Sequence, residues 1–159
     1  MNQEGLIKNQ LTKHLQGGKA FTSLSHFLND IPYEAVGKRP YDLPYSIFEL
    51  FYHMHIAQQD IMNFSMGHGY ETKNWPDDYW PSETAPKSKE EWKELKAQFF
   101  EDRNKLASWL KNEDNNILDI VKNGEDQTCL REILLVIEHN AYHTGQLFVL
   151  CRLLGVKNN

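Results

Sequence analysis

The sequence predicts an all-α protein that folds as a four-helix bundle. Hydrophobic residues recur at three- and four-residue steps in four long segments, the spacing that places side chains on one face of a helix. Two of these segments open with a serine followed three residues later by a glutamate, the capping box that marks a helix N-terminus. The length of 159 residues suits one domain, residues 1–159, with a core of ordinary size.

Composition and charge narrow the classes of function. The formal net charge is −5 and no Lys/Arg cluster is present, which argues against nucleic acid as the main partner. No apolar run reaches the ~18 residues of a membrane span, and the N-terminus lacks the pattern of a secretory signal, so we expect a cytoplasmic protein with no membrane partner. Cys129 and Cys151 would lie ~33 Å apart along one helix, which predicts reduced core thiols and no disulfide.

The first helix is expected from about Lys8 to Asn29. Its apolar stripe consists of Leu11, Leu15, Gly18, Phe21, Leu24 and Leu28. Gly17 and Gly18 interrupt this pattern, because each glycine destabilises a helix by ~1 kcal/mol relative to alanine. The pair indicates either a kink or a point where Gly18 lets another helix approach closely, and both interpretations stay open.

The second helix follows a proline-rich linker over residues 31–45. Ser46 and Glu49 form its capping box, and it is expected to run to about Phe64. Its inward stripe consists of Leu50, His53, Ala57, Ile61 and Phe64. Residues 65–87 then form a long loop rich in Trp and Pro between the second and third helices, a length that is uncommon in a compact domain unless the loop has a function.

The third and fourth helices complete the bundle. Ser88 and Glu91 form a second capping box, which opens a helix that runs to about Leu110. The fourth helix is expected from about Thr128 to Leu154, followed by Gly155. It is apolar almost all round, so it should be buried on more than one side. We favour a homodimer as the explanation; a central helix wrapped by the other three is the competing one.

Three histidines are the main candidate for a functional site. His139 and His143 are four residues apart, on one face of the fourth helix, and His53 lies on the apolar stripe of the second helix, roughly opposite His55. Three neutral imidazoles in an apolar pocket are a suitable ligand set for a borderline divalent metal, and they leave positions open for water or substrate. A single histidine near an apolar face is more often a hydrogen-bonded core residue, but three such positions favour a metal site.

Neighbouring residues suggest secondary roles. Gln146 is one helical turn from His143 and could orient a ligand imidazole, although it could also be an ordinary exposed glutamine. Gly145 would allow close packing beside a metal. The aromatic residues of the long loop, Trp75, Tyr79 and Trp80, could roof a pocket or simply anchor the loop.

A general base is not evident near the histidines. Asn140 and Ala141 occupy the middle of the histidine pair, where zinc proteases with the HExxH motif carry a glutamate. A carboxylate such as Asp60 or Asp42 could reach the metal from elsewhere in the fold.

The block His-Asn-Ala-Tyr-His-Thr-Gly-Gln over residues 139–146 resembles the C-terminal metal motif of the DinB-like (damage-inducible) superfamily. Residues 46–58, with a single histidine on the inward stripe, are similar to its second-helix motif, and the Gly-Gly pair and the Trp/Pro-rich loop match it as well. The resemblance spans nearly the whole chain. It implies an up-down-down-up four-helix bundle, frequently dimeric, that binds zinc, nickel or a similar metal through His53, His139 and His143.

The same resemblance bears on function. Characterised relatives include mycothiol-dependent isomerases and bacillithiol S-transferases, and other members are described as metal-dependent hydrolases. We therefore expect a metal-dependent enzyme that activates a thiol or water against a small electrophilic substrate. The thiol-dependent relatives imply a low-molecular-weight thiol as a second cofactor. The alternatives are a non-enzymatic metal- or ligand-binding protein and a structural dimer with buried histidines.

Overall fold

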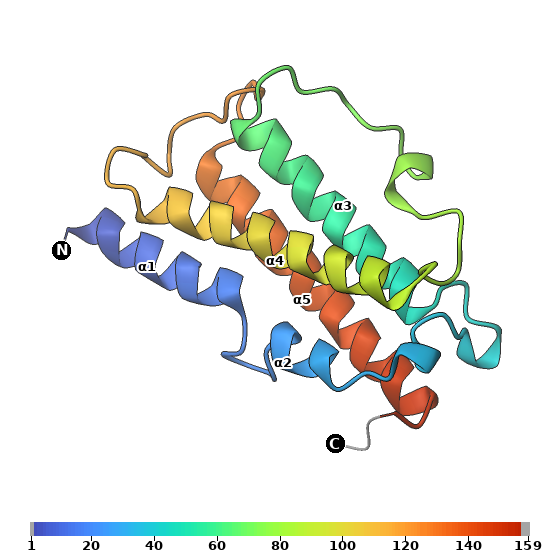
Figure 1. Cartoon of the computed structure of the whole chain (residues 1–159). Coiled ribbons are helices and arrows are strands. Elements are labelled where there is room, and N and C mark those ends of the chain that lie inside the picture. The colour runs from blue at the N-terminus through green and yellow to red at the C-terminus, as the bar shows by residue number, and fades with distance from the viewer. Residues whose placement is uncertain (1, 157–159) are drawn as a thin grey trace.

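The computed structural model describes residues 2–156, which form a bundle of four long helices (Figure 1). The long helices are α1 (Gln3–Gln16), α3 (Ile47–Met66), α4 (Lys89–Lys111) and α5 (Cys129–Leu153), and a short helix α2 (Leu24–Asn29) follows α1. Single 3₁₀ turns lie in the connections: η1 (Tyr33–Ala35), η2 (Pro40–Asp42) and η3 (Asp77–Tyr79). Figure 1 shows α1 and α5 running in one direction and α3 and α4 in the other, so the predicted all-α, up-down-down-up bundle is confirmed.

Each long helix packs mainly against two others. α1 and α3 both contact α4 and α5, which gives the order α1, α4, α3, α5 around the bundle. The alternative of a central α5 wrapped by the other three helices is therefore wrong. The large apolar residues exposed on α5 are Leu134, Tyr142, Val149 and Leu153, each at least 42% exposed. Residues 2–156 leave this outward face of α5 uncovered. Within residues 2–156, no helix is long and apolar enough to cross a bilayer.

The prediction of one helix from Lys8 to Asn29 is wrong. Two helices, α1 and α2, cover this region, and α1 begins and ends at other residues than predicted. α1 begins five residues earlier, at Gln3, where the side chain of Asn2 accepts a hydrogen bond from the Gly5 amide at 2.8 Å. It ends at Gln16, and the chain turns before α2 begins.

Two adjacent glycines produce this turn. Gly17 and Gly18 have φ angles of 76° and 77°, a region that residues with a Cβ rarely adopt. A Cβ at Gly17 would have no neighbour within 4 Å, and the three atoms nearest to one at Gly18 all belong to Ser23, the N-cap of α2. The pair therefore ends the helix, and the segment that lies closest to Gly18 is the start of α2.

The start of α3 is fixed by a complete capping box. The Ser46 hydroxyl accepts from the Glu49 amide at 3.2 Å, and the Glu49 carboxylate accepts from the Ser46 amide at 2.7 Å. Arg39 donates to the same carboxylate, which is almost fully buried. This anchoring sets the rotation of α3 and therefore the direction of His53, two turns further along the helix.

The second capping box is only half formed. The Ser88 hydroxyl accepts from the Glu91 amide at 3.1 Å, as predicted, but the Glu91 carboxylate accepts from the amide of Lys87 and not from that of Ser88. The apolar face of α4 is buried throughout: Trp92, Leu95, Phe99, Leu106 and Leu110.

The long connection between α3 and α4 packs onto the bundle, as its aromatic residues predicted. It leaves the end of α3 and returns along that helix to the start of α4 (Figure 1). Its turn η3 contacts α3, and Trp80 packs against the main core cluster. The loop therefore brings aromatic side chains to the helix that carries His53.

Candidate metal centre

The bundle brings the three predicted histidines together. His53 projects from α3, and His139 and His143 project from α5, the neighbouring helix. One nitrogen from each ring lies within 4.8 Å of the other two, so the group could hold a metal ion. His55 is also buried, but it lies outside this group and interacts electrostatically with Asp102 of α4. The group that could hold a metal therefore contains His53 and not His55.

The spacing of the imidazoles suits a small divalent ion. The Nε2 atoms of His53 and His139 are 3.1 Å apart, and the ring centroids of His139 and His143 are 4.4 Å apart. Nitrogen ligands at ~2.0–2.1 Å from a tetrahedral zinc ion lie ~3.3 Å from one another. The donor set thus fits a borderline metal with little adjustment of the side chains, and three ligands leave at least one coordination position open.

Burial keeps these imidazoles neutral. It is the main cause that lowers the pKa of His53 to about 4 and that of His139 to about 3, and the neighbouring histidines lower both further. The pKa of His143 is also lowered, by burial. The backbone of Tyr79 has the opposite, smaller effect and raises the pKa of His53. Its contact does not have the geometry of an ordinary hydrogen bond, so the buried Nδ1 of His53 has no hydrogen-bond partner among the described residues. Neutral imidazoles are the form that binds metal, so no proton has to leave at neutral pH.

Gln146 fixes the orientation of one ring. Its side-chain oxygen lies 2.6 Å from Nδ1 of His143. Because a carbonyl oxygen only accepts, Nδ1 must carry the proton, and Nε2 is left with a free lone pair for a metal. The close packing expected at Gly145 is wrong, since this residue is exposed and a Cβ there would have no neighbour within 4 Å.

Aromatic residues of the long loop cover one side of the histidines. The Trp80 ring stacks on His53 with centroids 4.3 Å apart and planes 7° apart, and the Trp75 ring lies 5.9 Å from the same imidazole. Tyr79 lies 6.3 Å away. The loop aromatics therefore both anchor the loop and form a roof, and this roof removes His53 from solvent.

Tyr79 and Tyr70 both interact with the carboxylate of Asp60 on α3. Tyr79 donates to Asp60 at 2.6 Å, and burial followed by the interaction with Asp60 raises the pKa of both Tyr79 and Tyr70. The other Asp60 oxygen is buried without a hydrogen-bond partner. Asp42, the second carboxylate considered as a base, is exposed on η2. Among the described residues, the group that could hold a metal contains histidines and no carboxylate.

Comparison with known proteins settles the family. The DinB family model matches residues 1–159, the full length of the chain. The chain belongs to the DinB family. A search of curated proteins and a search of solved structures gave no match.

Membership of the DinB family agrees with the helical bundle described above. Sequence reasoning missed the contacts that depend on the loop conformation, such as the bond from Tyr79 to Asp60. It also missed the hydrogen bond between the amides of Gln58, which is buried, and Asn140, which is half-buried, although both are polar residues within strongly apolar helices.

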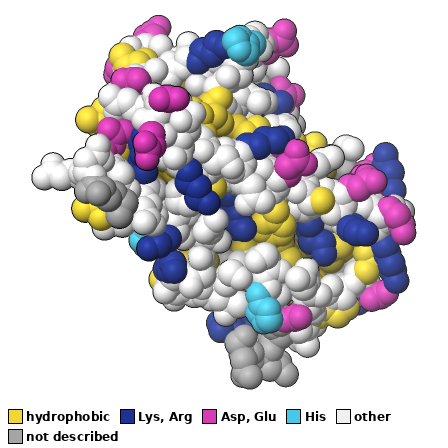
Figure 2. Space-filling view, turned by 60° about the vertical axis from the view of Figure 1, so that its left-hand side comes forward, with side chains coloured by type: hydrophobic (Ala, Val, Ile, Leu, Met, Phe, Trp, Pro, Cys, Tyr) yellow, Lys and Arg dark blue, Asp and Glu magenta, His cyan; other side chains and the backbone are white. Residues whose placement is uncertain are grey.

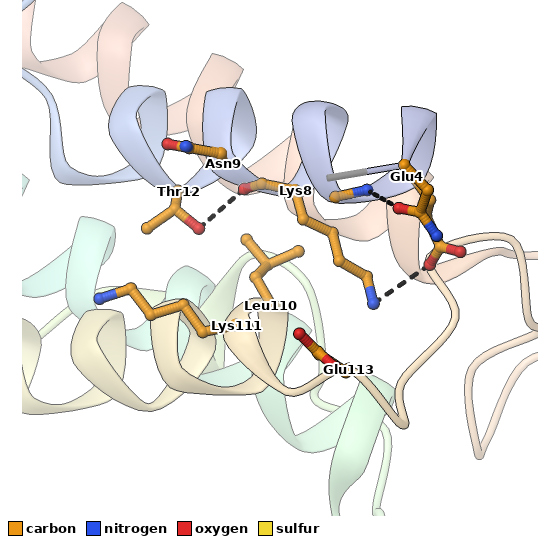
Figure 3. Close-up of a pocket in the computed structure, with 9 residues that line it drawn as sticks. Glu4, Lys8, Asn9, Thr12, Leu110, Lys111 and Glu113 are labelled. Atoms are coloured by element: carbon orange, nitrogen blue, oxygen red, sulfur yellow. Dashed lines mark hydrogen bonds and ion pairs between the residues drawn. The ribbon is translucent and has the colours of Figure 1, made fainter.

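A wide groove elsewhere on this DinB-family protein has a structural explanation. It measures about 660 Å³ and lies between α1 and the C-terminal end of α4 (Figure 3). Lys8 spans it and donates to Glu4 at 3.1 Å, to the Asn112 carbonyl at 3.2 Å and to the Asn115 carbonyl. These contacts use all three ammonium hydrogens, so Lys8 ties α1 to the loop after α4.

Proposed function

We propose that this DinB-family protein is a metal-dependent enzyme that activates a thiol or water against a small electrophilic substrate. The observation that carries the proposal is the convergence of His53, His139 and His143, with one nitrogen from each within 4.8 Å of the others. Zinc or nickel fits three imidazole ligands best. When bound, such a metal acts as a Lewis acid that lowers the pKa of a water or thiol ligand.

The residues around the histidines support this chemistry. Gln146 holds the tautomer of His143 that presents Nε2, and Trp80 stacks on His53 and shields it from solvent. Tyr142, whose ring lies 4.9 Å from that of His143, also borders the histidines.

An activity assay tests the proposal. Untagged protein loaded with zinc or nickel is incubated with a low-molecular-weight thiol and a reactive aryl halide, and in parallel with hydrolysable esters. We expect a metal-dependent rate in one assay that is lost in His143→Ala and kept in His14→Ala, which removes an exposed histidine of α1. An unchanged rate in His143→Ala would refute the role of this centre.

A non-enzymatic metal- or ligand-binding protein is the second candidate. It is favoured by the lack of a carboxylate in the described metal group and by the bond that ties Asp60 to Tyr79. It predicts stoichiometric metal binding with neither thiol conjugation nor hydrolysis.

We also propose a homodimer and a cytoplasmic location. The uncovered apolar face of α5 supports the dimer, because a second copy would remove it from water. Cys129 and Cys151 are buried and form no disulfide with each other, which supports a reducing compartment.

A further inference from the structure

A pair of hydrogen-bonded side-chain amides joins the two helices that carry the histidines. Gln58 of α3 is 1% exposed, and its side-chain oxygen accepts from Nδ2 of Asn140 on α5 at 3.0 Å. Its Nε2 donates to the Phe99 carbonyl of α4 at 2.8 Å. Gln58 follows His53 by five residues on α3, and Asn140 follows His139 directly on α5. One side chain therefore connects three of the four long helices close to the candidate metal ligands.

The backbone determines how the two amides are oriented. The Phe99 carbonyl can only accept a hydrogen bond, so it faces the NH2 group of Gln58. The Gln58 oxygen is therefore turned toward α5, where the NH2 group of Asn140 supplies a donor. Oδ1 of Asn140 is buried and has no hydrogen-bond partner within residues 2–156. An unpaired buried acceptor destabilises a protein, and an apolar pair would avoid this cost, so the amides indicate a role other than stability.

Apolar packing alone does not fix how α5 lies against α3. α5 buries Ile133, Val136 and Leu147 and also exposes Leu134 and Val149, so it is apolar on most sides. On the face shown in Figure 2, charged side chains lie on the outside and hydrophobic ones fill the spaces between them. Hydrophobic burial is not directional, so a helix of this kind can rotate or slide at little cost. A hydrogen bond between side chains of two helices, in contrast, forms in one register only.

The metal centre requires one register of α5. The Nε2 atoms of His53 and His139 lie 3.1 Å apart, and the ring centroids of His53 and His143 lie 4.8 Å apart. A shift of α5 by one residue would move its two histidines by ~1.5 Å along the helix and turn them by about 100°. Imidazole nitrogens must lie ~2.0–2.1 Å from a zinc ion, so they could not converge on one ion after such a shift.

We propose that Gln58 and Asn140 are positioning residues for the metal centre proposed above, on which this inference rests. Their bond holds α5 in the register that brings His139 and His143 against His53. Neither amide belongs to the group of side chains that could hold a metal, so the pair acts through the two helices and not by ligation. The arrangement of the three rings therefore depends on the pair even in the absence of a metal.

Zinc affinity of the untagged protein, measured by competition with a chelator, is the first test. Gln58→Met keeps the length of the side chain but removes both hydrogen bonds. We expect it to weaken zinc binding about tenfold, as when about one tenth of the molecules hold the competent register. Asn140→Leu should also weaken zinc binding, and the double variant should lose little more than either single variant, since all three lack the same bond. Gln59→Met changes the neighbouring, half-buried glutamine and should bind zinc as the unmodified chain does.

A second control separates positioning from a loss of stability. Leu106→Ala removes buried apolar surface in the core cluster shared by α1, α4 and α5, so it should lower the free energy of unfolding but leave zinc affinity unchanged. Unchanged affinity in Gln58→Met, equal weakening by Leu106→Ala, or fully additive effects of Gln58→Met and Asn140→Leu would each overturn the proposal. Should Gln58→Met fail to fold, Asn140→Leu alone decides the matter.

The metal-free protein gives a readout that does not depend on zinc. Nuclear magnetic resonance should show Overhauser effects between the ring protons of His53 and His139 in the unmodified chain and in Gln59→Met, and weaker ones in Gln58→Met. Equal effects in Gln58→Met, or none in the unmodified chain, would overturn the proposal. A chain that shows the expected difference but binds no zinc would contradict the metal function alone, so the failures of the two proposals are distinguishable.

Discussion

At the scale of single residues, burial determines the chemistry of the candidate centre. His53 is 2% exposed and His143 is 9% exposed, so each imidazole gives up water that would stabilise its charged form. The pKa of each histidine falls for this reason, and the three rings can lie within contact distance without repelling one another. The same burial should make the metal-free protein sensitive to acid.

We predict that the metal-free protein loses stability as the pH falls from 6.5 to about 4. In this window the unfolded chain protonates histidines near pH 6.5, whereas folding holds the pKa of His53 at about 4 and that of His139 at about 3. Each extra proton bound by the unfolded state changes the free energy of unfolding by at most ~1.4 kcal/mol per pH unit. Urea denaturation at several pH values measures this slope. His139→Gln should flatten it, and an identical slope in that variant would contradict the account.

Gln146 offers a second test at this scale. In Gln146→Leu, Nδ1 of His143 loses its acceptor and the ring is no longer held with Nε2 toward the site. We expect metal affinity to fall by ~10–100-fold, measured by competition with a chelator. Gln98→Leu, which changes an exposed glutamine of α4, is the matched control. Equal affinities in the two variants would mean that Gln146 has no orienting role.

At the scale of elements, the helix ends position the centre. A helix end could be predicted from the sequence where a side chain caps an amide a few residues further along, as Ser46 and Thr128 do. The break at Gly17 was missed because Leu24 and Leu28 of α2 fall in phase with the apolar stripe of α1. The start of α1 was missed because its first turn carries exposed apolar residues, which give no periodic signal.

The same distinction applies to the candidate site. The histidines could be predicted because helical spacing and an apolar stripe are local properties of the sequence. The stacking of Trp80 on His53 and the bond from Tyr79 to Asp60 depend on the path of a long loop, which no local pattern specifies. The bonds from Gln58 to Phe99 and from Asn140 to Gln58 likewise arise only when α3, α4 and α5 are placed in the bundle.

Two glycine substitutions should have opposite effects on stability. Gly17 has φ 76° and ψ −172°, so Gly17→Ala should destabilise the fold by ~1–3 kcal/mol. Gly145 lies inside α5 with open space around it, so Gly145→Ala should stabilise the protein by ~0.5–1 kcal/mol. Urea denaturation at pH 7.5 measures both free energies of unfolding. Destabilisation by Gly145→Ala would show that this glycine has a packing role absent from the single chain.

At the scale of the whole molecule, the outward face of α5 leads to an oligomerisation prediction. A stable interface buries ~800 Å² on each partner, and an exposed stripe along a 25-residue helix can supply much of this area. We expect the protein to sediment as a dimer at tens of micromolar. Val149→Lys should yield a folded monomer, whereas Leu118→Lys, which changes an exposed apolar residue outside α5, should leave the dimer intact. A monomer without any substitution would contradict the prediction.

Metal binding by the three histidines remains the central claim, and X-ray absorption of zinc-loaded, untagged protein tests it most directly. The account predicts one zinc ion per chain with about three imidazole nitrogens at ~2.0–2.1 Å and one lighter ligand completing the shell. In His143→Ala the imidazole count or the stoichiometry should fall, while His14→Ala keeps both. A spectrum without imidazole ligands, or one that is the same in His143→Ala, would contradict the assignment of His53, His139 and His143 as the metal centre.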